Sequence, residues 1–178
     1  DGTVFDTEAR LALLALHERS RDWRAAVEVA ARLERSGSGS FATRIANYWC
    51  ELALEADARQ QTTEADAALK RAREAAPQAP RPLIMAGQRA RARSDHREAL
   101  QQWGTLMAAH PSAFNLVAVD YADSAKTIGE GPAALERLEA LYRRGPTTDL
   151  LAALARLDDD ATRQRRRVLS PLQHQPPL

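Results

Sequence analysis

The sequence predicts an all-α fold in which antiparallel helix pairs stack into an array, and three observations lead to this expectation. The first is a set of small and apolar residues that recurs every 34 or 35 residues. The second is a proline after each of these copies, where its ring removes a backbone donor and ends a helix. The third is composition: 44% hydrophobic residues with only 5% aromatic ones favour close packing of Ala- and Leu-rich helices over a sheet core.

The recurring set identifies the type of repeat. Its copies are Ala65, Leu69, Ala72 and Pro77; Ala99, Trp103, Leu106 and Pro111; Ala134, Leu138, Leu141 and Pro146; and, 39 residues before the first of these, Ala26, Ala30, Leu33 and Gly37. A period of about 34 residues is that of the tetratricopeptide repeat, a helix-turn-helix unit that stacks into a right-handed solenoid. Such arrays bind other proteins through a surface, so a binding face is expected in place of a catalytic pocket.

The repeat register divides the whole chain, residues 1–178, into units. Four repeats are expected near residues 7–40, 41–79, 80–113 and 114–148, with a partial fifth over residues 149–178. The Gly- and Ser-rich stretch at residues 36–40 is too short for a domain linker and is expected to be a loop between repeats.

Apolar spacing supports the first two helix pairs. In the first pair, Leu11, Leu14 and Ala15 share one helix face and the turn falls near residues 20–22. The second pair begins near Phe41 and continues through Trp49, and extra residues around 57–63 lengthen this unit.

The later units follow the same pattern. In the third pair, Gly87 allows a close approach of two helices, and residues 96–109 form the returning helix. The fourth pair has Leu116 and its neighbours on a packed face, a turn at residues 129–132, and a helix over residues 134–142. The fifth has a helix over residues 150–157 and a short one over residues 161–172. Among these positions, the residues expected in the core are Ala65, Leu69, Gly87, Ala99 and Trp103.

Charge, cysteine content and hydropathy exclude several classes of function. The net charge of +1 offers no overall field for nucleic acid or an anionic membrane. The single cysteine, Cys50, allows no internal disulfide and no cysteine-based metal site. No apolar run approaches the roughly 20 residues that span a bilayer. The chain begins with an aspartate, so it is expected to be a fragment of a longer protein.

Few residues suggest catalysis. The histidines, among them His17 and His96, show no metal-ligand spacing, and no nucleophile-base arrangement is evident. Cys50 follows Trp49 in the middle of a helix, which favours a packed residue over a redox sensor. The basic cluster at residues 163–167 lacks neighbouring aromatic residues that could stack on bases, and a solvated helix face is the favoured interpretation. No enzyme activity and no nucleic-acid partner are therefore expected.

Three stretches go beyond the general repeat pattern. They are residues 5–10, residues 22–26 and residues 45–53, of which the last reads Ile-Ala-x-aromatic-aromatic-Cys-Glu-Leu-Ala. Together they resemble the lipopolysaccharide assembly protein B family of Gram-negative bacteria, over about residues 3–167 and with decreasing specificity.

That resemblance implies a function and a set of partners. The family has an N-terminal membrane helix, a cytoplasmic tetratricopeptide array and a C-terminal zinc ribbon with two Cys-x-x-Cys pairs. It acts as an adaptor that helps the membrane protease FtsH degrade the deacetylase committing precursor to lipid A, under an inner-membrane regulator of lipopolysaccharide level. This chain shows neither the membrane helix nor the cysteine pairs, so it resembles the central array and no cofactor, zinc included, is expected in it. The resemblance places it at the cytoplasmic face of the inner membrane, and a homodimer is possible. A general tetratricopeptide scaffold for complex assembly or secretion is the alternative.

The repeat register also predicts which side chains line the concave groove. In such arrays the first helix of each pair lines it through its second, fifth, ninth and twelfth positions. These positions are Glu8, Leu11, Ala15 and Glu18 in the first unit, Asn47, Cys50, Leu54 and Asp57 in the second, and Arg81, Ile84, Gln88 and Arg91 in the third. This mixture suits a peptide or helix with apolar anchors and a few charged contacts.

Overall fold

The computed structural model describes residues 2–158, and every regular element in that part of the chain is a helix. The described helices gather into two compact units, one over residues 2–85 and the other from residue 86 to residue 158. None of the described helices is both long and apolar enough to cross a bilayer.

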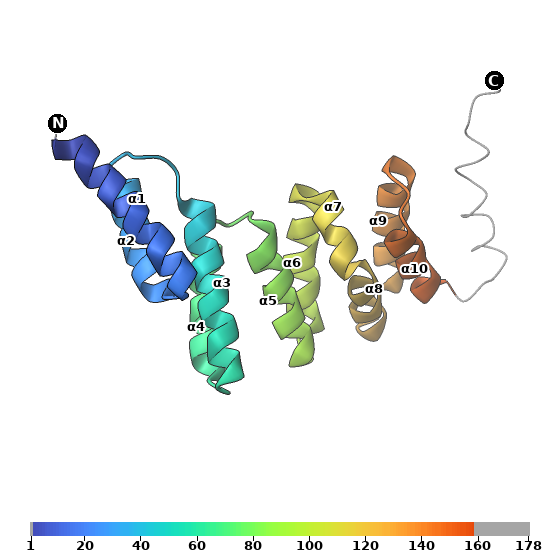
Figure 1. Cartoon of the computed structure of the whole chain (residues 1–178). Helices are drawn as coiled ribbons and strands as arrows, with labels where there is room; N and C mark the ends of the chain where they lie inside the picture. Colours follow the sequence, from blue (N-terminus) through green and yellow to red (C-terminus); the bar gives the residue numbers. More distant parts are fainter. Residues whose placement is uncertain (1, 159–178) are drawn as a thin grey trace, which may run out of the picture. The chain divides into compact units, whose positions relative to one another are not determined.

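The first unit consists of successive antiparallel helices joined by short turns (Figure 1). Its helices are α1 (Gly2–Ser20), α2 (Trp23–Arg35), α3 (Ala42–Ala58), α4 (Thr62–Ala75) and the first residues of α5 (Pro80–Ala92). Helix α1 packs on α2, α2 on α3, and α3 on α4. From α1 to α4, each helix thus packs on the next one in sequence, as repeat packing requires.

The second unit continues the pattern with one irregularity. Its elements after α5 are α6 (His96–Ala109), α7 (Pro111–Phe114), the 3-10 turn η1 (Asn115–Val117), α8 (Ala118–Thr127), α9 (Gly131–Arg144) and α10 (Thr148–Leu157). Helix α8 packs on α6, α9 and α10. The first helix of the fourth repeat is therefore divided into α7, η1 and α8.

The turns inside the helix pairs share one backbone feature. Arg21, Gln60 and Ser94 have φ values of 58°, 60° and 64°, and the fourth turn has Gly129 at 75°. These residues lie 39, 34 and 35 positions apart, so the left-handed residue recurs with the period of the repeat. Only glycine adopts this conformation without cost, so three of the four turns are strained by their side chains.

Side-chain caps fix where three helices begin. The carboxylate of Asp22 accepts from the backbone N–H of Ala25, and Asp95 accepts from Glu98 in the same way. The hydroxyl of Thr147 accepts from Leu150. Each cap satisfies a donor that the first helical turn leaves unpaired.

The predicted core is confirmed, because Ala65, Leu69, Gly87, Ala99 and Trp103 are all buried. The structure also explains the glycine. A Cβ added to Gly87 would lie 2.5 Å from Cδ1 of Trp103 and closer still to Nε1 and Cε2 of the same indole. Only a residue without a side chain allows α5 to approach α6 this closely.

The all-α prediction of antiparallel helix pairs is confirmed, with two corrections. Helix α1 begins at Gly2 and not near residue 7. Leu116 is 76% exposed and does not lie on a packed face, because η1 interrupts the helix at this residue and shifts the register. The predicted helix at residues 161–172 and the basic cluster at residues 163–167 lie outside the described residues.

Candidate partner-binding face

The predicted groove residues of α1 and α3 lie mostly at the surface. Leu11 and Leu54 are 41% and 46% exposed, which leaves much of two large apolar side chains in water. Ala15 is exposed beside Leu11 on the same helix. Single exposed leucines are common on protein surfaces, so these two are candidates for a partner contact only because the repeat register predicts them in the groove.

The remaining predicted residues of the first unit differ in how far they are exposed. Glu8 and Asp57 are exposed, while Glu18, Asn47, Arg81 and Ile84 are half-buried. We call the predicted residues of α1, α3 and α5 the first-helix face and describe its part in each unit separately.

Cys50 requires a correction, because its side chain is completely buried and cannot touch a partner at the surface. Burial raises the pKa of its thiol to about 11. A thiol of this kind remains protonated and packs as a small apolar side chain, which is the interpretation that the sequence favoured over a redox sensor.

Glu18 is the acceptor of the first ion pair on this face. Its Oε1 accepts from Nη2 of Arg44 at 2.6 Å and from the hydroxyl of Tyr48. Burial alone would raise the pKa of Glu18. The hydrogen bonds from Tyr48 and Arg44 together outweigh burial, so the pKa lies below its usual value of 4.5. Burial and the bond to Glu18 raise the pKa of Tyr48 to about 12. The Tyr48 ring stacks on Trp23 with centroids 5.9 Å apart, so α3 contacts both helices of the preceding pair.

Glu51 on α3 joins α5 to the turn between α1 and α2. Its Oε1 accepts from Nη2 of Arg81 at 2.8 Å, and its Oε2 lies 3.7 Å from Nη2 of Arg21. Arg81 therefore does not extend freely from the face, since it is anchored to the helix of the preceding repeat.

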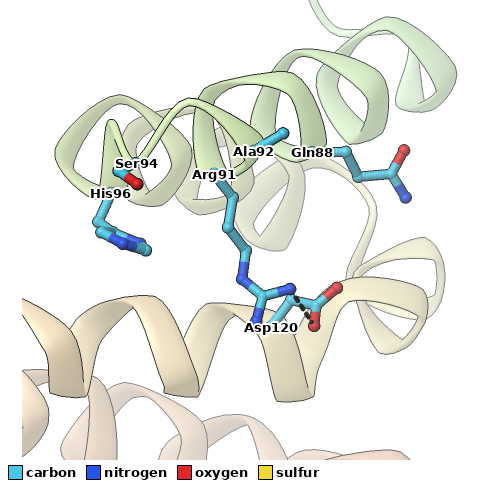
Figure 2. Close-up of a pocket in the computed structure, with 6 residues that line it drawn as sticks. All are labelled: Gln88, Arg91, Ala92, Ser94, His96 and Asp120. Carbon is cyan, nitrogen blue, oxygen red and sulfur yellow. Dashed lines mark hydrogen bonds and ion pairs between the residues drawn. The ribbon is translucent and has the colours of Figure 1, made fainter.

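The second unit contains an open pocket of about 390 Å³, lined in part by positions of α5 that the repeat register predicts in the groove. Figure 2 shows Gln88, Arg91 and Ala92 on α5, Ser94 and His96 at the turn into α6, and Asp120 on α8. Two of these, Gln88 and Arg91, are predicted groove residues.

Arg91 spans the pocket toward α8. Its Nη1 donates to Oδ1 of Asp120 at 2.9 Å, and its Nη2 lies 3.8 Å from Oδ2 of Asp123. Asp123 in turn lies 3.4 Å from Nη1 of Arg156 on α10. A network of two arginines and two carboxylates therefore links α5, α8 and α10.

His96 closes the other side of the pocket. Its Nδ1 lies 3.0 Å from the hydroxyl of Ser124, which is fully buried on α8. The imidazole thus satisfies a buried hydroxyl and is held in place by it.

These contacts are ion pairs and hydrogen bonds between side chains that are mostly half-exposed. The charged side chains of the pairs are partly exposed, so each pair stabilises the fold by only about 0–1 kcal/mol. Because opposite charges lie side by side, the pocket offers donors and acceptors without a strong net field. In the part of the chain that the structure describes, no group of three or more His, Cys, Asp or Glu side chains could hold a metal ion.

Several of these residues were missed from the sequence, although a signal was present. Acidic and basic residues about one repeat apart pair across successive helices: Glu51 with Arg81, 30 positions apart, and Asp123 with Arg156, 33 apart. Opposite charges at nearly the repeat period, on the first helix of each pair, would have identified both contacts.

Comparison with known proteins supports the resemblance stated above. Lipopolysaccharide assembly protein B from three strains of Escherichia coli is 31% identical to this chain over 101 residues. The match covers 57% of this chain and 26% of the relative, so the chain spans about a quarter of the length of the curated relatives it matches. No protein-family model matches the chain.

Proposed function

We propose that this chain is a protein-binding module that acts in the control of lipopolysaccharide assembly. The observation that carries the proposal is its similarity to lipopolysaccharide assembly protein B over more than half its length. A surface suited to protein contact, with Leu11 and Leu54 exposed, supports it.

The specific form of the proposal is an adaptor without turnover of its own. It brings the deacetylase that commits precursor to lipid A to the membrane protease FtsH, at the cytoplasmic face of the inner membrane. An inner-membrane regulator of lipopolysaccharide level controls this step. The inert Cys50 thiol and the mutually paired charges around Arg91 are consistent with a binding role.

The face suggests how each unit contributes to binding. In the first unit, Leu11 and Leu54 insert into apolar recesses of a partner helix or peptide. In the second unit, Gln88 and Arg91 exchange hydrogen bonds with polar groups of the partner at the pocket. Apolar anchors provide most of the affinity, and the polar pocket fixes the register.

The test is recovery of the two partners from a Gram-negative membrane extract. The tagged chain is expected to retain both FtsH and the deacetylase, quantified by mass spectrometry. Leu54→Glu and Arg91→Glu should each reduce recovery, because one buries a charge at an anchor and the other reverses a charge in the pocket.

One variant serves as a matched control. Arg143→Glu reverses an arginine whose side chain is 74% exposed on α9, the second helix of a pair. It should recover the partners as the wild type does. Recovery of neither FtsH nor the deacetylase would contradict the specific proposal, and capture of a different assembly complex would favour a general scaffold.

A further inference from the structure

His96 makes one hydrogen bond that determines what the rest of its ring offers to the pocket. Its Nδ1 lies 3.0 Å from the hydroxyl oxygen of Ser124, a fully buried residue of α8. His96 itself is half-buried and lines the pocket, so its other ring nitrogen, Nε2, is the polar atom left for a bound molecule. Whether Nε2 donates or accepts is set by which ring nitrogen carries the proton.

The surroundings of the Ser124 hydroxyl decide where that proton is. Hydroxyls of Thr105 and Thr127 donate to the backbone carbonyl four residues earlier in their own helices. Within the described part of the chain the Ser124 hydroxyl makes no such bond, and its partner is His96. A buried O–H group without an acceptor is unfavourable, so the Ser124 proton points at Nδ1. Neutral His96 therefore carries its own proton on Nε2 and donates from that atom.

The charges beside His96 are balanced. Nη1 of Arg91 donates to Oδ1 of Asp120, and the contacts of Asp123 with Arg91 and Arg156 add one further charge of each sign. Within residues 2–158, Oδ2 of Asp120 accepts no hydrogen bond. Figure 2 shows His96 and Arg91 extending from the α5–α6 segment toward α8, where Asp120 lies. The pocket therefore offers a neutral donor and a carboxylate acceptor with little net charge.

An uncharged amide group matches this combination. Its carbonyl oxygen accepts from Nε2 of His96, and its N–H donates to Oδ2 of Asp120. A carboxylate would add a negative charge beside Asp120, and an ammonium or guanidinium group would meet Arg91. The volume of about 390 Å³ lies in the range of about 300–1,000 Å³ found for whole ligands. It therefore favours a stretch of main chain over the amide of one Asn or Gln side chain.

We propose that the pocket binds the main chain of an extended, uncharged segment of a partner protein. His96 donates from Nε2 to a carbonyl oxygen of that segment, and Ser124 is the positioning residue that holds this tautomer. The identity of the partner rests on the proposed function, whereas the tautomer and the class of ligand are measured without that partner.

The tautomer is tested by ¹⁵N–¹H correlation spectra of the full chain with labelled histidine at pH 8. We expect His96 with Nε2 protonated and Nδ1 bare, assigned from the signals that His96→Asn removes. Ser124→Ala removes the group that holds this tautomer, so both tautomers of His96 should become populated. Thr127→Ala is the matched control, because it deletes a hydroxyl of the same helix that bonds to a backbone carbonyl, and it should change nothing.

The class of ligand is tested by titration with acetylated and amidated trialanine, an uncharged piece of main chain. It should shift the His96 Nε2–H signal saturably at roughly 1–50 mM, because so small a ligand binds weakly. Sodium acetate should leave that signal in place. His96→Asn keeps an acceptor for Ser124 but has no donor at the Nε2 position. It should weaken deacetylase binding about two- to tenfold, the effect of one neutral hydrogen bond.

Four results would overturn the proposal. They are a wild-type His96 protonated on Nδ1, a signal that trialanine does not shift, an equal shift by acetate, and tighter binding of propionamide, which mimics a glutamine side chain. The proposed function fails separately. A chain that binds trialanine as described but not the deacetylase contradicts only the proposed function, and deacetylase binding that His96→Asn leaves unchanged contradicts only the present proposal.

Discussion

Replacing Gly87 by alanine tests the packing of α5 on α6 most sharply. The added Cβ would lie 2.5 Å from Cδ1 of the fully buried Trp103, whereas carbon atoms attract each other best at about 3.5–4.0 Å. The helices must therefore separate or the indole must leave its position. Overpacking of this kind costs about 1–3 kcal/mol.

Alanine also has a favourable effect that reduces this cost. It is a better helix former than glycine by about 0.5–1 kcal/mol. We therefore expect Gly87→Ala to lower the free energy of unfolding by about 1 kcal/mol, which is the difference between the middle values of these two ranges.

Gly104 provides the matched control, because it lies within α6 and a Cβ added there would meet nothing within 4 Å. Gly104→Ala gains the helix preference without the clash, so it should raise the free energy of unfolding by about 0.5–1 kcal/mol. Urea titration followed by circular dichroism at 222 nm measures both variants, with the slope of the transition checked for constancy. A Gly87→Ala protein as stable as the wild type, or a Gly104→Ala protein that is equally destabilised, would refute the close-packing argument.

Three further predictions follow from the turns, the buried thiol and the ion pairs. Gln60→Gly should raise the free energy of unfolding by about 0.5–1 kcal/mol, because it relieves the left-handed backbone at φ 60°; urea titration would contradict this if the midpoint fell. Cys50 should react with a thiol reagent at pH 8 only after unfolding, since burial raises the pKa of the thiol to about 11; rapid labelling of the native chain would show the residue to be accessible. Glu18→Gln should cost at most about 1 kcal/mol at pH 7. Because Tyr48 and Arg44 hold the pKa of Glu18 below 4.5, its contribution is complete above that value and is lost as the pH falls through the lowered pKa. An equal difference between the two proteins at pH 3 and pH 7 would exclude the ion pair as its source.

The sequence predicted the features that depend on local spacing. The recurrence of Ala65, Leu69, Ala99 and Trp103 predicted helix pairs and their buried faces, because helical periodicity and stacking fix which positions face inward. Gly87 was predicted as a close-approach position for the same reason.

Features that depend on backbone detail were not predicted. Nothing in the spacing distinguishes a regular first helix in the fourth repeat from the observed break at residues 115–117, which exposes Leu116. For Cys50, an error of one position in assigning the repeat register changes the predicted place of the side chain from the core to the surface. The reason is that adjacent helix residues are about 100° apart around the helix axis.

The partners of charged side chains were missed for a different reason. Long arginine and glutamate side chains have many rotamers, and their choice depends on the distance between helices in the folded chain. The pairing of Glu18 with Arg44 and of Arg91 with Asp120 therefore required the structure.

The central claim is that this chain binds a protein through its first-helix face. Titration of the purified lipid A-pathway deacetylase into the purified chain, followed by isothermal calorimetry, tests it most directly. We expect saturable binding that Leu54→Glu and Arg91→Glu weaken and that Arg143→Glu leaves unchanged. Absence of binding, or binding that all three variants leave unchanged, would contradict the account.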